Sequence, residues 1–232
     1  MPAEITLLSA GAVKPGLVKV VDAFRRASRH EVKLEFATAP VIVKRLGAGE
    51  MVDLVIAPPA ILDELAALGK IFPTQAVIGR IGVGVMVRDS TPLPRIATVD
   101  DFKQSLLKAR SLVYNRASTG IYLETLFDRL GIAAALKSKS TRYPDFAAVL
   151  EHVKKGNQGE IGLGATTVII ECQSQGVKFV GPLPAAIQNY TIYSAAVTSM
   201  GEAKGAAREL LRHLTSAATE DMFAAAGITG RE

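Results

Sequence analysis

The sequence predicts an α/β protein of two lobes, each built on a mainly parallel sheet flanked by helices, with two extended segments joining the lobes. Three observations support this fold class. Short apolar runs alternate with amphipathic helical patterns over residues 5–78 and again over 82–187, which is typical of parallel sheets covered by helices. Two long extended segments, 78–88 and 188–198, interrupt that alternation. No apolar run approaches the roughly 18 residues of a membrane span.

The amino-acid composition further restricts the class of protein. The chain has 232 residues, of which 49% are hydrophobic and 21% are charged, as expected for a globular protein. Its net charge of +5 comes from scattered Lys and Arg, which indicates either a solvated surface or a field that favours small anions. No basic stripe alternates with aromatic residues, so nucleic-acid binding is not expected. Cys172 is the only cysteine, which excludes an intrachain disulfide, and we expect a buried thiol.

The first lobe begins with a strand at 4–8 and a helix from about Pro15, a residue suited to a first helical turn. An alternating strand at 32–36 precedes Thr38-Ala39-Pro40, where a second helix begins. A buried strand at 52–57 and a helix that ends at Gly69 follow. This order predicts parallel strands.

The second lobe opens with the β-rich segment 78–88 and a helix at 99–109. Asp145 is expected to cap a helix, after a polar connection that contains Lys137, Lys139 and Arg142. The remaining expected elements are strands at 112–114, 160–165 and 177–180, a helix or strand at 166–173, an extended segment at 188–197, a helix at 204–214 and a helical turn at 221–226.

The stretch from Asn115 to Gly131 carries the clearest local signal. A strand leads into Ser118-Thr119-Gly120, and either hydroxyl could cap the following helix. Apolar residues then recur at helical spacing, and Gly131 stands where a C-cap glycine belongs. Free N–H groups and the positive end of the helix dipole would make this turn suitable for an anion.

Four strand-to-helix junctions share this chemistry, two in each lobe. In open α/β sheets, ligands bind outside the carboxyl ends of the strands, where such junctions lie. We therefore expect the junctions to surround a small anion in a cleft, although each hydroxyl could instead only cap its own helix. The junctions are Ser9-Ala10-Gly11, Thr38-Ala39, Ser118-Thr119-Gly120 and Tyr143-Pro144-Asp145.

Other polar residues lie near these junctions. Lys14 follows the first and Arg116 precedes the third, and either could bind a carboxylate or pair with a surface acid. The second extended segment carries Gln188, Asn189, Tyr190 and Tyr193, which could reach the ligand or form hydrogen bonds within a sheet.

Catalytic and cofactor signals are weak. His30, His152 and His213 are predicted to lie on solvated helix surfaces. Gly79, Gly82 and Gly84 do not form a dinucleotide fingerprint, and no phosphate-binding loop or metal-ligand cluster occurs. We expect neither a cofactor nor a metal.

Several segments together resemble the periplasmic molybdate-binding proteins and, more broadly, the type 2 periplasmic solute-binding proteins. Phe36-Ala37-Thr38-Ala39, Gly47-Ala48-Gly49-Glu50 and 52–57 are similar to the family's FxxS and GAPADxxISA segments. Ser118-Thr119-Gly120-Ile121-Tyr122 resembles PAGIY, and 161–164 falls at the family's LGIVY. The resemblance spans nearly the whole chain and implies the two-lobed type 2 fold, with an oxyanion bound at the first three turns.

The departures from the family pattern concern the ligand. The family's ligand tyrosine falls on Ala165, and its second-turn serine falls on Thr38 or Ala39. The family holds molybdate mainly by neutral donors, whereas this chain brings Lys14 and Arg116. These changes favour a small organic carboxylate over molybdate.

We therefore expect lobe 1 at 1–79 plus 198–232 and lobe 2 at 80–197, the latter including crossing strands at 80–88 and 188–197. The expected function is that of a hinge-bending solute-binding protein that closes on a small anion, with an ABC permease as a candidate partner. The expected ligand-binding residues are Ser9, Gly11, Lys14, Thr38, Ala39, Arg116, Ser118, Thr119, Gly120, Gln188, Asn189, Tyr190 and Tyr193.

Two other functions remain open. One is a cofactor-independent isomerase of a di- or tricarboxylic acid, resembling aconitate isomerase, with Lys14, Tyr190 or Tyr193 as the base. The other is a cytoplasmic ligand sensor. The sequence as written shows no signal peptide, which predicts a cytoplasmic protein, or a periplasmic one if a leader has been removed.

Overall fold

The computed structural model describes residues 2–156 and 158–230. The chain divides into two compact units, unit 1 formed by Met1–Ile81 and Ile192–Glu232 and unit 2 by Gly82–Thr191. The sequence placed these boundaries at 79/80 and 197/198, whereas the division falls at 81/82 and 191/192. The chain therefore passes between the units within two long strands, β4 (Ile71–Arg88) and β9 (Tyr190–Thr198).

Unit 1 is built on a sheet with the strand order β2-β1-β3-β9-β4. Strands β1 (Glu4–Ala10), β2 (Glu31–Ala37) and β3 (Leu54–Ala57) are parallel, and β9 is antiparallel to β3. Strand β1 lies at the centre of the parallel set and has four consecutive buried residues at its end.

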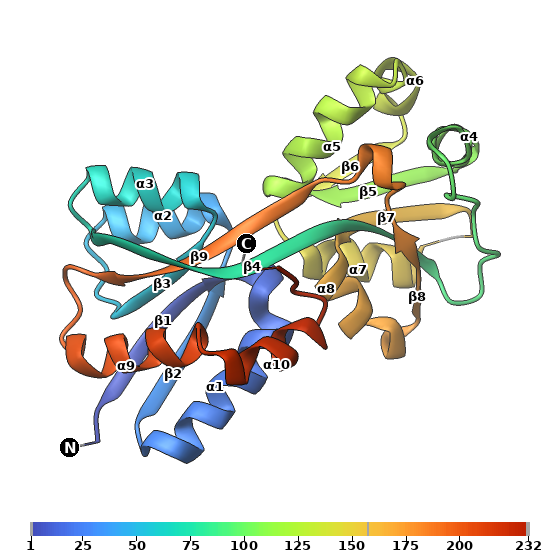
Figure 1. Ribbon diagram of the computed structural model, residues 1–232. Helices are drawn as coiled ribbons and strands as arrows, with labels where there is room; N and C mark the ends of the chain where they lie inside the picture. The colour runs from blue at the N-terminus through green and yellow to red at the C-terminus, as the bar shows by residue number, and fades with distance from the viewer. Residues whose placement is uncertain (1, 157, 231–232) are drawn as a thin grey trace. The chain divides into compact units, whose positions relative to one another are not determined.

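Helices cover both faces of this sheet. Helices α2 (Ala39–Gly47) and α3 (Pro59–Ala67) lie on one face, and α1 (Lys14–Ser28), α9 (Lys204–Leu214) and α10 (Glu220–Ala224) lie on the other (Figure 1). Helix α1 contacts both α9 and α10. Gly16 makes the α1–α10 contact close, because a Cβ at this position would lie 2.8 Å from Phe223 Cδ1 and 2.9 Å from Ile228 Cδ1.

Unit 2 has the strand order β4-β7-β5-β6, with β8 (Val177–Pro182) also pairing with β4. Strands β5 (Ser111–Asn115), β6 (Ser140–Tyr143) and β7 (Glu160–Ala165) are parallel, and β4 is antiparallel to β7. The predicted class, a mostly parallel α/β fold, is confirmed.

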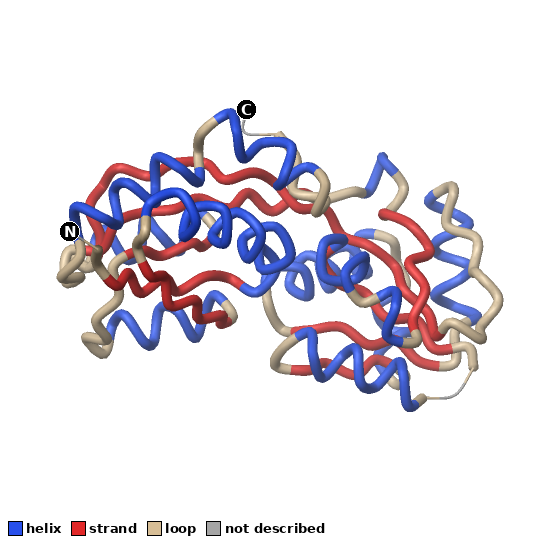
Figure 2. Tube along the Cα trace, turned by 90° about the horizontal axis from the view of Figure 1, so that it is seen from below, coloured by secondary structure: helices blue, strands red, loops and turns tan. Residues whose placement is uncertain are grey.

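Two hydrophobic clusters form the core of unit 2. One joins helices α4 (Val99–Lys108), α5 (Ser118–Arg129) and α6 (Ala133–Lys137) to residues such as Leu112 and Tyr114 of β5. The other joins α7 (Phe146–Lys155) and α8 (Thr166–Glu171) to Val113 and Met86. Alternate residues of β5 thus enter different clusters, as expected for a strand with both faces covered. Figure 2 shows helices along both sides of the strands in each unit.

Most predicted elements are present, with three differences. The segment 137–142 was expected to be a polar connection. The first difference is that it contains the end of α6, and the second is that it contains most of β6. Strand β6 is at the edge of the sheet and its four residues are exposed or half-buried, so it lacks the apolar alternation by which strands are recognised. The third difference is that β4 begins at Ile71, although Pro73 lies within it.

Candidate functional site

In unit 1, the parallel strands end at one edge of the sheet. Their register places Ser9 of β1 beside Phe36 of β2 and Ile56 of β3. The turns that follow β1 and β2 therefore leave the sheet side by side. Lys14, at the start of α1, lies over the same edge, with its Nζ 5.7 Å from the centroid of the Phe36 ring. This is within the range of a cation–π contact.

The turn residues of unit 1 differ in what they present. Gly11 begins a 3₁₀ turn, and a Cβ built on it would meet no atom within 4 Å, so there is open space beside its backbone. Thr38 is the N-cap residue of α2, but its hydroxyl makes no cap hydrogen bond. The expected alternative, that this hydroxyl only caps its helix, is therefore wrong. Ala39 is the first residue of α2 and is buried.

Ser9 is fully buried, and its Oγ donates to the carbonyl of Ala10 over 3.2 Å. The Ser9 hydroxyl therefore already has a hydrogen-bond partner at the end of β1. Its role as a ligand contact remains a prediction.

In unit 2, the corresponding turn joins β5 to α5. Helix α5 begins at Ser118, and its N-cap is Ala117, which makes no side-chain cap bond. The prediction that Ser118 or Thr119 caps this helix is wrong, because both residues lie within the helix; the N–H of the N-cap residue, Ala117, donates to the side chain of Asn115 (3.2 Å). Within residues 2–156 and 158–230, the N–H groups of Ser118, Thr119 and Gly120 have no hydrogen-bond partner. These are the orphan donors that helix starts leave available.

Gly120 has a structural reason to be glycine. A Cβ at this position would lie 1.7 Å from the carbonyl oxygen of Asn115, a distance that no side chain can occupy. The first turn of α5 therefore packs directly on the end of β5, which fixes where its N–H groups lie.

Arg116 lies between β5 and α5. Its backbone N–H donates to the carbonyl of Tyr143 at the end of β6 (2.9 Å). Its side chain is exposed, and among the described residues no acid pairs with its guanidinium. Lys14 is likewise exposed and has no acidic partner in the part of the chain that the structure describes. Neither Lys14 nor Arg116 therefore forms the ion pair with a surface acid that the sequence left open.

The polar residues of the second extended segment serve different purposes. The Gln188 amide accepts from the Val83 N–H (2.9 Å) and donates to the Val83 carbonyl (3.0 Å), while the Asn189 N–H donates to its Oε1 (3.0 Å). Gln188 thus completes hydrogen bonds of β4 within unit 2. Asn189 is half-buried, and Tyr190 is 51% exposed.

Tyr193 and its neighbour Ser194 lie in the part of β9 that belongs to unit 1. Both are buried, and burial raises the pKa of Tyr193 to about 12. Ser194 lies opposite Ala57, the last residue of β3, so it stands at the same sheet edge as the turns of unit 1. No sequence signal pointed to Ser194, because it is a single serine in an apolar strand.

The three histidines are not the solvated surface residues that the sequence predicted. The His30 ring accepts from the Ala3 N–H through Nδ1 (3.0 Å), and its Nε2 lies 3.2 Å from Glu209 Oε2. His213 Nε2 is buried. His152 Nδ1 lies 2.8 Å from the Tyr143 hydroxyl, and its Nε2 lies 3.6 Å from buried Glu160. Helical periodicity identified the polar positions but not these cross-element contacts.

A cavity of about 520 Å³ in unit 2 surrounds the last of these histidines. It is lined by Tyr143, Ala148, Glu151, His152, Lys155, Gly156 and Glu160. Gly156 allows the Glu160 carboxylate to approach, since a Cβ there would lie 1.6 Å from Glu160 Oε2. None of the expected ligand residues lines this cavity.

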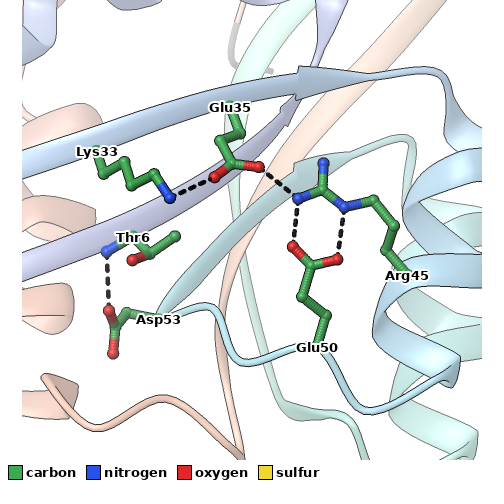
Figure 3. Close-up of polar contacts among 6 residues, drawn as sticks. All are labelled: Thr6, Lys33, Glu35, Arg45, Glu50 and Asp53. Carbon is green, nitrogen blue, oxygen red and sulfur yellow. Dashed lines mark hydrogen bonds and ion pairs between the residues drawn. The ribbon is translucent and has the colours of Figure 1, made fainter.

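An ionic network in unit 1 ties β2 to α2 (Figure 3). The guanidinium of Arg45 contacts the carboxylates of Glu35 and Glu50, and Lys33 Nζ lies 2.9 Å from Glu35. Arg45 holds the pKa values of Glu35 and Glu50 below their usual range, chiefly through these hydrogen bonds.

Asp53, a residue of the resemblance segment, is structural. Its carboxylate accepts from the backbone N–H of Thr6 (2.8 Å; Figure 3) and of Ala203 before α9 (2.8 Å). It therefore connects β1 to the start of a C-terminal helix.

The described residues contain no group of three or more His, Cys, Asp or Glu that could hold a metal ion. Across the same residues, no helix combines the length and the apolar character needed to cross a membrane.

The fold is shared with anion-binding proteins. The Azotobacter vinelandii periplasmic molybdate-binding protein superposes with a TM-score of 0.80 at 14% identity, over 97% of this chain and 99% of that one. The sulfate-binding protein SubI of Mycobacterium tuberculosis gives 0.77 at 16% identity, over 97% and 86%. The tungstate ABC transporter protein of Geobacter sulfurreducens gives 0.73 at 11% identity, over 96% and 98%. At these identities, the likeness shows the fold.

The fold is therefore the one that these solute-binding proteins share. Residues 5–229 match the sequence model of a family described as bacterial extracellular solute-binding proteins, and the chain belongs to that family. A curated relative, the aconitate isomerase of a Pseudomonas species, is 32% identical over 223 residues, which cover 91% of this chain and 82% of that protein.

Proposed function

We propose that the protein binds a small organic anion with carboxylate groups, through donors at strand-end turns. The observation that carries the proposal is in unit 2, where three consecutive unpaired N–H groups, at Ser118, Thr119 and Gly120, follow an arginine with no acidic partner among the described residues. Backbone donors at a helix start and a guanidinium are both suited to a carboxylate.

Unit 1 supports the same chemistry. Thr38 offers a hydroxyl that does not cap its helix, and Lys14 offers a charge close to the same turn. We propose that hinge closure accompanies ligand binding, as is expected of this class.

Two features favour a carboxylate over molybdate. Ala165 ends β7 and is the N-cap of α8, so the position where the resemblance places a tyrosine has no side-chain donor. Lys14 and Arg116 add cations in place of neutral donors. The relative named aconitate isomerase points in the same direction, because its name implies a tricarboxylate.

The experiment compares two arginines that flank β5 at opposite ends. Arg116→Ala should weaken the binding of a carboxylate ligand by about ten- to a hundredfold, since a hydrogen bond to a charged group contributes about 1.5–3 kcal/mol. Arg110→Ala removes the same charge from an exposed position before β5 and should leave the affinity unchanged. Calorimetric titration measures both. Equal affinities for the Arg116 variant and the original protein would remove Arg116 from the site.

A second candidate, isomerisation of the bound acid, is favoured by the 32% identity to aconitate isomerase over 91% of the chain. In such a reaction, a base removes a proton from one carbon, the double bond shifts, and a proton is added at another carbon, so no cofactor is required. Among the proposed bases, Tyr193 fits the role of a proton donor better, because burial raises its pKa to about 12. Lys14 and Tyr190 remain the proposed bases.

Proton exchange tests this candidate. Incubation of the protein with cis-aconitate in deuterated water should yield trans-aconitate that carries deuterium, as followed by NMR. Binding of cis-aconitate without deuterium exchange would contradict the isomerase function and leave only the function of a binding protein.

The solute-binding function implies a partner. We propose that an ABC permease receives the loaded protein, in keeping with the extracellular description of the family.

A further inference from the structure

Phe36 places an aromatic ring near the end of β2 in unit 1. Its register partner is Ser9, near the end of β1. The side chain of the preceding residue, Glu35, contacts Arg45 of α2. Because successive side chains of a strand point to opposite faces, Phe36 faces the side of the sheet that α1 covers (Figure 1). The ring is half-buried, so part of its surface is accessible to a neighbouring group.

The Phe36 ring carries the ammonium group of Lys14. Lys14 is the first residue of α1, and its Nζ lies 5.7 Å from the ring centroid, within the range of a cation–π contact. Its side chain is exposed, and no acid among residues 2–156 and 158–230 pairs with it. An ammonium on a flexible four-carbon chain does not keep a fixed position by itself. The ring therefore restricts where this charge lies relative to the ends of β1 and β2.

A second aromatic–cation contact in unit 1 lies at the other end of the parallel strands. The Phe72 ring carries Lys204 Nζ at 5.8 Å and the Arg208 guanidinium at 5.6 Å. Lys204 follows Ala203, whose N–H donates to Asp53, the residue before β3. This contact therefore lies where the parallel strands begin, away from the turns that follow β1 and β2. The half-buried Phe72 ring is thus a matched comparison, because it holds cations where the proposed function needs none.

We propose that Phe36 is a positioning residue of the ligand site, whose ring holds the Lys14 ammonium over the ends of β1 and β2 to contact a carboxylate of the ligand. This inference rests on the proposed function and adds a specificity-determining residue to it. An ammonium on an aromatic face keeps its charge, and its N–H groups that point away from the ring can still donate to a carboxylate. Hydrogen bonds between two charged groups are stronger than those between neutral ones, so the position of this charge matters for affinity.

A double-mutant cycle tests whether Phe36 acts through Lys14. The variants are Phe36→Leu, Lys14→Met and the two combined. Phe36→Tyr is the conservative replacement, because it keeps the aromatic ring, and Phe72→Leu is the matched control. Affinities for succinate, citrate and cis-aconitate are measured by calorimetric titration, and urea denaturation checks that each variant is folded.

Phe36→Leu should weaken the binding of the acids by about two- to fivefold, the scale of a cation–π contact at an exposed site. Phe36→Tyr should retain the affinity, and Phe72→Leu should leave it unchanged. In the Lys14→Met background, Phe36→Leu should cause no further loss, because the charge that the ring positions is no longer present.

Two results would overturn the proposal and leave the proposed function intact. One is an unchanged affinity for Phe36→Leu. The other is an equal loss for Phe36→Leu with and without Lys14, which would show that the ring acts on the ligand or on the fold directly. If the original protein binds none of these acids, the proposed function itself fails.

Discussion

At the scale of single residues, several side chains have roles other than those their sequence positions indicated. Gln188 was expected either to reach the ligand or to form hydrogen bonds within a sheet, and its amide completes the hydrogen bonds of Val83. Asp53 belongs to a segment that resembles the molybdate-binding proteins, yet it joins two backbone segments. Residue type and spacing identify polar positions, but partners far apart in the chain decide whether each polar group remains available.

Arg45 carries a prediction at this scale. Hydrogen bonds from Arg45 lower the pKa values of Glu35 and Glu50. Carboxylates whose pKa is lower in the folded state contribute stability above their unfolded pKa of 4.5, and this stability is lost as the pH falls through the folded pKa. These side chains are 27% and 36% exposed, so screening limits the effect to about 1 kcal/mol or less.

Urea denaturation at about pH 7 and about pH 4 measures this effect. The free energy of unfolding should decrease from about pH 7 to about pH 4, and this decrease should be smaller in Arg45→Met than in the original protein. Arg212→Met, a control at an exposed position on α9, should keep the slope of the original protein. An identical slope for the Arg45 variant would show that the network does not set the acid sensitivity.

At the scale of elements, the sequence predicted the strand–helix rhythm better than the ends of the elements. Apolar periodicity located α5 and α7, and Asp145 caps α7 as predicted by accepting the Ala148 N–H (2.9 Å). The start of α5 was misjudged, because the helix already begins at Ser118 and its N-cap is Ala117. Strand β6 was missed because it is polar and lies at a sheet edge.

The junction between β5 and α5 shows what the sequence could not give. Gly120 was proposed as a ligand residue for its free backbone, but its missing side chain also lets the helix rest on the Asn115 carbonyl. Alanine at this position would push α5 away from β5, so any effect on ligand binding would include a displacement of the helix. The sequence alone does not reveal whether a glycine is required for ligand contact by its backbone or for close packing of a helix on a strand.

At the scale of the whole molecule, each unit carries its own sheet and its own set of donors. Membership of the solute-binding family covers residues 5–229 and accounts for this arrangement. The number of lobes and the crossing strands could be predicted, because long β-rich segments interrupt a regular pattern. The place of Ser194 could not be predicted, since only the register of β9 against β3 brings it to the edge where the turns begin.

The central claim is that the ligand is a small acid with several carboxylates. The most direct measurement is a thermal-shift series on the unmodified protein with molybdate, tungstate, sulfate, phosphate and mono-, di- and tricarboxylates. A ligand at about 100 times its Kd adds about 2.7 kcal/mol of stability, which is readily detected. We predict a rise in Tm with di- or tricarboxylates and none with the metal oxyanions. A rise with molybdate or tungstate alone would contradict the account and assign the chain to oxyanion binding.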